Sequence, residues 1–89
     1  MEKHLEAKFR KAVIAKGGLA LKWVSPGYSG VPDRIVLMPG GKVYFVELKN
    51  GAKEPDPLQK IVHRELIKLG FDVRTIGFNH EISDFIDEL

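Results

Sequence analysis

The chain has 89 residues, no cysteine and a formal net charge of +2 at pH 7. This length favours a single domain over residues 1–89, and the lack of cysteine excludes disulfides and thiolate zinc sites. No apolar run in the sequence reaches the length of a membrane span, so we expect an intracellular, cytoplasmic protein without a membrane partner.

The charged residues are unevenly distributed along the chain. All 14 Lys and Arg residues lie in the first 79 positions, together with 8 of the 12 acidic residues. Most of the chain therefore carries an excess of positive charge, which favours a polyanion such as nucleic acid as its partner.

The pattern of apolar and turn-forming residues predicts seven elements in the order helix, three strands, helix, strand, helix. In chain order they are a helix over residues 2–16, a strand over 19–24, a hairpin within 30–49, a helix over 57–69, a strand over 71–76 and a short terminal helix. The hairpin turn occupies residues 39–41, a length that places a glycine in the left-handed region.

The second helix has the clearest beginning. Asp56 is the expected N-cap, Pro57 occupies the first helical position, and Gln59 is the capping-box residue. Apolar residues at helical spacing predict its buried stripe: Leu58, Ile61, Val62, Leu66 and Leu69. In the terminal helix the corresponding stripe consists of Ile82, Phe85, Ile86 and Leu89, and it either caps the sheet or pairs two subunits.

The hairpin strands are apolar on both faces, so helices are expected on both sides of the sheet. A strand, a crossover helix and a further strand give parallel neighbours, whereas the hairpin is antiparallel. The sequence therefore predicts an α/β fold with a central mixed sheet of about four strands flanked by helices.

Two carboxylates meet at the open end of the predicted hairpin. Pairing around the turn places Asp33 directly opposite Glu47, with Lys49 on the same face two residues further on. Like charges at opposite positions destabilise a sheet, whereas two carboxylates and an ammonium suit a divalent-metal site with a lysine beside it. The backbone carbonyl of Leu48 is an additional oxygen ligand in this interpretation. The alternative is a hairpin that merely carries surface charges at its end.

The strings SPGYSGVPDRIV, VYFVELKNG and PLQKIVHRELIKLGFDV contain Pro32, Asp33, Glu47, Leu48 and Lys49 in the pattern of the PD-(D/E)xK nucleases. Together they resemble the virus-type replication-repair nuclease (VRR-NUC) family over roughly residues 25–73. The order of elements extends this resemblance over nearly the whole chain.

The resemblance implies a PD-(D/E)xK nuclease-like fold that uses Mg²⁺ or Mn²⁺. By position, Asp33 and Glu47 correspond to metal ligands, Lys49 to the catalytic lysine and Gln59 to a motif residue near the site. Glu6 corresponds to the acidic residue that many members supply from the first helix, although Glu2 lies one turn away and is an alternative. From helical spacing alone, Glu6 is instead an exposed carboxylate paired with Arg10.

The resemblance further implies a homodimeric endonuclease acting on branched DNA, such as four-way junctions or flaps, in replication, recombination or repair. It leaves open whether the gene belongs to a phage that acts in its host cell or to a cell. Two other functions are compatible with the sequence. One is a catalytically silent nucleic-acid-binding module that needs a partner, and the other is a small interaction domain in which the motif is coincidental.

Overall fold

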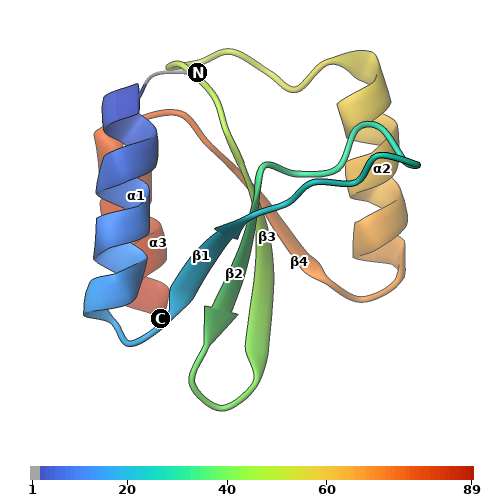
Figure 1. Ribbon diagram of the computed structural model, residues 1–89. Helices are drawn as coiled ribbons and strands as arrows, with labels where there is room; N and C mark the ends of the chain where they lie inside the picture. Colours follow the sequence, from blue (N-terminus) through green and yellow to red (C-terminus); the bar gives the residue numbers. More distant parts are fainter. Residues whose placement is uncertain (1–2) are drawn as a thin grey trace.

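The computed structural model describes residues 3–89 and shows the predicted order of elements around one sheet (Figure 1). The elements are α1 (Lys3–Ala15), β1 (Leu19–Lys22), β2 (Arg34–Met38), β3 (Lys42–Leu48), α2 (Pro57–Lys68), β4 (Asp72–Ile76) and α3 (Asn79–Glu88). The α/β fold with helices on both sides of a mixed sheet is confirmed.

The four strands lie in the order β1-β2-β3-β4. The first three are antiparallel neighbours, and β4 pairs parallel to β3 after the α2 crossover. Met38 pairs with Lys42, so the predicted hairpin register is confirmed. Gly40 and Gly41 have φ angles of 85° and 77°, so the turn uses two left-handed glycines where one was expected.

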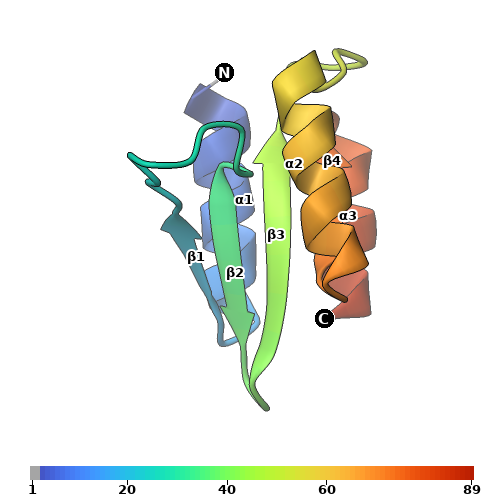
Figure 2. The same ribbon diagram turned by 90° about the vertical axis from the view of Figure 1, so that its right-hand side faces the viewer.

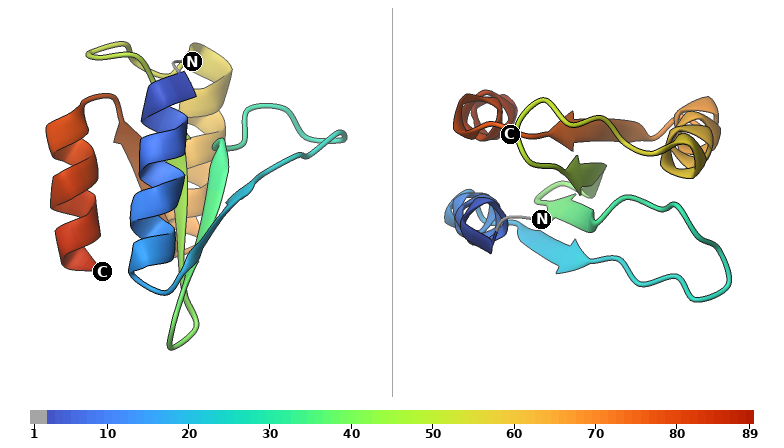
Figure 3. Two further views of the ribbon diagram at one scale, coloured as in Figure 1. Left: turned by 60° about the vertical axis from the view of Figure 1, so that its left-hand side comes forward. Right: turned by 90° about the horizontal axis from the view of Figure 1, so that it is seen from above.

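Helices α1 and α3 cover one face of the sheet, as the view from above in Figure 3 shows. The main core lies between them and the strands and consists of Leu5, Phe9, Val13, Ala20, Val36, Met38, Val46, Leu48, Ile76, Ile82 and Phe85. Because the α3 residues Ile82 and Phe85 are each only 2% exposed, the apolar stripe of this helix caps the sheet.

The other face is covered by α2 alone, and only in part. Figure 2 shows α2 on the β4 side of β3, whereas β1 and β2 have no helix over them on this side. The predicted stripe of α2 is wrong at three positions, since Leu58, Ile61 and Leu69 are exposed. The buried residues of α2 are Val62 and His63. One apolar side of α2 packs on the sheet through Val62, and the other, which includes Leu58 and Ile61, is exposed to solvent.

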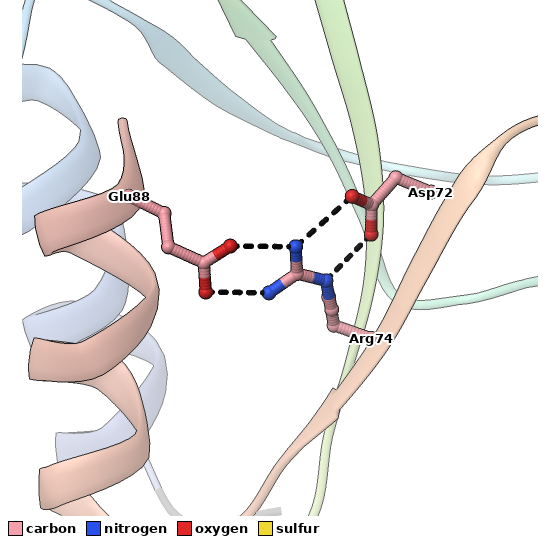
Figure 4. Close-up of polar contacts among 3 residues, drawn as sticks. All are labelled: Asp72, Arg74 and Glu88. Carbon is pink, nitrogen blue, oxygen red and sulfur yellow. Dashed lines mark hydrogen bonds and ion pairs between the residues drawn. The ribbon is translucent and has the colours of Figure 1, made fainter.

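An ionic cluster fastens α3 to β4, the last strand of the sheet (Figure 4). The Arg74 guanidinium donates to both carboxylate oxygens of Asp72, at 2.6 and 3.0 Å, and to both of Glu88, each at 2.9 Å. It also lies 5.3 Å from the centre of the Phe85 ring. The pKa of Arg74 is raised mainly by its bonds to Glu88 and then to Asp72, so the guanidinium stays charged at neutral pH.

No helix within residues 3–89 combines the length and the apolar character needed to cross a bilayer.

Candidate active site

The open end of the β2–β3 hairpin and the beginning of α2 enclose a hollow of about 190 Å³. Five of the six predicted site residues line it, namely Asp33, Glu47, Leu48, Lys49 and Gln59. Asn50 and Lys53, from the loop that follows β3, line it as well. Because a water molecule occupies about 30 Å³, there is room for a hydrated ion or a phosphate group.

Asp33 stands immediately before β2 and continues the strand pairing with its side chain. The last backbone pair of the hairpin joins Arg34 to Val46, one step before Asp33 and Glu47. Beyond it, the Leu48 N–H donates to Asp33 Oδ2 at 3.0 Å, while the Asp33 carbonyl accepts from the Trp23 N–H at 2.8 Å. The carboxylate is thereby fixed against the end of β3.

Glu47 is the most deeply buried charged residue of the site, with 1% of its surface exposed. Its Oε2 accepts from Gln59 Nε2 at 2.9 Å and lies 3.2 Å from the Lys49 ammonium. Its Oε1 is buried without a hydrogen-bond partner among the described residues. Burial, and then the negative charge of Asp33, raise the pKa of Glu47 against the opposing effect of Lys49. The charged form of this carboxylate is therefore disfavoured in the folded protein.

Gln59 joins the beginning of α2 to the site through three hydrogen bonds. Its backbone N–H donates to Asp56 Oδ1 and its Oε1 accepts from the Asp56 N–H, each at 3.0 Å, which completes the predicted capping box. Its remaining polar group, Nε2, donates to Glu47. The same side chain thus begins the helix and orients a carboxylate of the site.

His63 is a residue of this region that the sequence analysis did not single out. It lies one helical turn after Gln59 and is 7% exposed, and its Nε2 is buried without a hydrogen-bond partner among the described residues. Burial and the nearby Lys49 charge lower its pKa below 6.5, against the opposing effects of Asp33 and Asp56. The signal in the sequence is the spacing of four from Gln59, which places both side chains on one face of α2.

Glu6 is not brought to this hollow. Its carboxylate accepts from Arg34 Nη2 at 3.1 Å, and Arg34 also donates to the Ala20 carbonyl. The pairing with Arg10 that helical spacing favoured is not the one observed. Successive side chains of a strand point to opposite faces, so Arg34 meets α1 while its neighbour Asp33 faces the α2 side. Glu2 lies outside the described residues.

The donor set fits a hard divalent cation. Across residues 3–89 no cluster of three or more acidic, histidine or cysteine side chains is arranged to hold a metal. Asp33 and Glu47 offer two carboxylates, and the carbonyl of Leu48 leaves β3 on the same side as its N–H, which faces Asp33. Mg²⁺ is commonly held by one or two carboxylates and several waters, and the unpartnered Glu47 Oε1 is a free ligand atom.

Comparisons with known proteins find similar proteins, although no family model matches the chain. It is 48% identical over 73 residues to "Putative nuclease p44" of Acyrthosiphon pisum secondary endosymbiont phage 1, a match that covers 82% of this chain and 74% of that protein. A solved structure described as a VRR_NUC domain superposes with a TM-score of 0.92 at 32% identity, covering 97% of this chain and 94% of the other.

Proposed function

Because the chain belongs to the VRR-NUC family of nucleases, we propose that it is a Mg²⁺- or Mn²⁺-dependent DNA endonuclease that hydrolyses phosphodiester bonds. The observation that carries this proposal is the hollow in which Asp33, Glu47 and Lys49 converge, with one carboxylate oxygen unpartnered. A chain selected for stability alone has no reason to bury a carboxylate opposite another.

In this proposal Asp33, Glu47 and the Leu48 carbonyl hold the cation. When bound, a divalent cation polarises the phosphate and lowers the pKa of an attacking water. Glu6 is not part of this ligand set, because its carboxylate is paired with Arg34. Two adjacent carboxylates beside a single ammonium carry an excess of negative charge, which supports a bound cation at this site.

Lys49 and Gln59 act on the same carboxylate from two sides. The Lys49 side chain is 17% exposed and lines the hollow, so its ammonium can orient the attacking water or offset negative charge that develops on the phosphate. Gln59 holds Glu47 Oε2 and so leaves Oε1 directed away from the amide. We therefore assign Lys49 a catalytic role and Gln59 a positioning role.

The preferred substrate in this proposal is branched DNA, such as a four-way junction or a flap, cut by a homodimer. Two sites related by a two-fold axis can cut opposing strands, which one small subunit does not readily do. The uncovered side of the sheet and of α2 supports such pairing, because it leaves apolar side chains in solvent, namely Leu19, Leu21, Leu58, Ile61, Ile67 and Leu69.

The test is cleavage of labelled DNA of matched sequence as single strand, duplex, flap and four-way junction, each with Mg²⁺, Mn²⁺ or EDTA. We expect metal-dependent cutting of branched DNA that Asp33→Asn abolishes and the exposed control Asp84→Asn preserves. Analytical ultracentrifugation at the assay concentration measures the oligomeric state, which we expect to be a dimer. Tight binding without cutting under any metal would refute the enzyme and favour a silent binding module.

A further inference from the structure

The hollow of the candidate active site continues across one end of the sheet. It shares Lys53 with a neighbouring hollow between the loop after β3 and the turn before α3. That hollow shares Gly51, Gly77 and Phe78 with a third, which reaches the first turns of α1 and has a volume of about 400 Å³. In Figure 1 the loop after β3, the turn before α3 and the beginning of α1 lie at the same end of the sheet. Because neighbouring hollows share lining residues, the three are treated together as one groove, called here the end groove.

The end groove contains an exposed aromatic ring. Phe78 is 42% exposed and stacks on His80, with ring centres 5.4 Å apart and an angle of 19° between the ring planes. Phe78 lines two of the three hollows. An exposed ring with a parallel neighbour is a platform that a nucleobase can extend by stacking, whatever its identity.

The side chains that flank this ring favour a phosphate. His4 and Lys8 are one turn apart on α1, and both are exposed and line the third hollow. Lys53 lies at the other end, where the groove meets the candidate active site. Cations on either side of an aromatic ring are the arrangement by which proteins bind single-stranded nucleic acid.

Outside the candidate active site, two carboxylates line the end groove, and both are already engaged. Glu54 is paired with Lys60 at 3.0 Å. Glu81 Oε1 accepts from the N–H groups of Gly77 and Phe78, at 2.8 and 3.0 Å, and so caps α3. Neither carboxylate is left unpaired to repel a nucleic-acid backbone.

Backbone contacts fix the ring relative to the catalytic lysine. The Lys49 N–H donates to the Ile76 carbonyl and the Gly51 N–H to the Gly77 carbonyl, both at 2.9 Å. A Cβ atom at Gly77 would collide with the Gly51 carbonyl oxygen, so the two loops are in direct contact. The platform at Phe78 therefore holds a constant position relative to Lys49.

We propose that the end groove binds an unpaired nucleotide next to the scissile phosphate, with its base stacked on Phe78 and its phosphate between His4 and Lys8. The inference rests on the proposed nuclease function and makes it more specific. The enzyme would select DNA in which a nucleotide beside the cut is free of its complementary strand, as at a flap or a junction, because a paired base cannot reach the ring.

The experiment measures binding without cleavage, in EDTA, of a short single strand that contains 2-aminopurine, a base whose fluorescence is quenched by stacking. Phe78→Ala is expected to weaken binding about 5- to 100-fold and to remove the quenching, because stacking on one ring contributes this much per base. Phe78→Tyr should retain both. The matched control is Phe71→Ala, which removes another phenylalanine that is 42% exposed but lies against Phe45, away from the end groove.

The flanking cations give a second measurement. Lys8→Ala should reduce the slope of log affinity against log salt by about 0.7, the value for one contact to a single-stranded phosphate. Lys42→Ala, at the hairpin turn, should leave the slope unchanged. Thermal unfolding of each variant shows whether the fold is retained.

Wild-type protein that does not bind the single strand, or a folded Phe78→Ala that binds and quenches like wild type, would overturn the proposal. Ring-dependent binding together with no cleavage of any DNA would refute the nuclease and leave the nucleotide site standing. If wild type and Phe78→Ala prefer branched DNA over duplex to the same extent, the proposed nuclease function stands but the nucleotide site does not determine its selectivity.

Discussion

Replacing Glu47 with glutamine is expected to abolish activity and yet stabilise the fold. Glu47 is buried, and its pKa is raised because burial and the Asp33 charge together outweigh the attraction of Lys49. A raised pKa means that the native state disfavours the charged carboxylate. An amide of nearly the same volume removes the charge without leaving a cavity.

The size of the gain follows from the contacts of this side chain. Burying a polar group costs about 1–3 kcal/mol and burying a charged group costs more, so the amide recovers part of this cost by removing the charge. Loss of the attraction between Glu47 and Lys49 offsets part of the gain. We therefore expect a net gain of about 1 kcal/mol at pH 7, or a rise in Tm of about 4–8 °C for a domain of this size. By contrast, Lys49→Met leaves two carboxylates without an ammonium and should cost about 3 kcal/mol.

The gain should depend on pH with a definite sign. Because the pKa of Glu47 is higher in the folded state than its ordinary 4.5, wild type has its full stability below pH 4.5 and loses part of it as the pH rises through the folded pKa. Glu47→Gln should therefore match wild type at pH 4 or below and exceed it at pH 7.

The assay is urea and thermal unfolding in EDTA of wild type, Glu47→Gln and Lys49→Met, with the exposed Glu54→Gln as control. Excess Mg²⁺ should then raise the Tm of wild type and leave that of Glu47→Gln unchanged, because binding to the native state alone stabilises it. A Glu47→Gln variant less stable than wild type at pH 7 in EDTA would refute the reasoning, since the ion pair would then outweigh the burial.

Three further predictions concern the surroundings of the site. Gly77→Ala should destabilise the fold by more than 1 kcal/mol and lower activity, because its Cβ would collide with the loop after β3, whereas Gly27→Ala, with open space around it, should change neither urea unfolding nor cleavage. Arg74→Ala should lower stability by about 1 kcal/mol in low salt and loosen α3, seen as faster amide exchange in that helix, through loss of the ion pairs and of the contact with Phe85. NMR should show that His63 titrates below 6.5, because its pKa is lowered in the folded state. Its contribution to the free energy of unfolding is therefore complete above pH 6.5 and is lost as the pH falls through the folded pKa. His63→Leu should flatten this part of the stability–pH profile, and an unchanged profile would contradict the prediction.

The parts of the site that local pattern determines were predictable from the sequence. The turn at residues 39–41 and the alternation of side chains fix the hairpin register, which brings Asp33 and Glu47 to one hollow. The cap formed by Asp56 and Gln59 also follows from adjacent residues. Their roles in catalysis remain predictions, which the variants above test.

The other features depend on how distant elements pack. Helical spacing identifies the apolar residues of α2 but not which of its two apolar sides meets the sheet, so Leu58 and Ile61 were wrongly expected to be buried. The partner of Glu6 lies 28 positions away, at Arg34, and no local pattern indicates it. His63 resembles a surface residue in the sequence, and only the docking of α2 buries it.

The three hydrogen bonds of Gln59 restrict what evolution or an engineer can place at this position. Glutamate would complete the cap equally well but has no N–H for Glu47 and would add a third negative charge to the site. Asparagine is one methylene shorter, so its side chain cannot reach both the Asp56 N–H and Glu47. We therefore expect position 59 to tolerate no substitution, and variants that stabilise the beginning of α2 should be made at Pro57 or in the loop before Asp56.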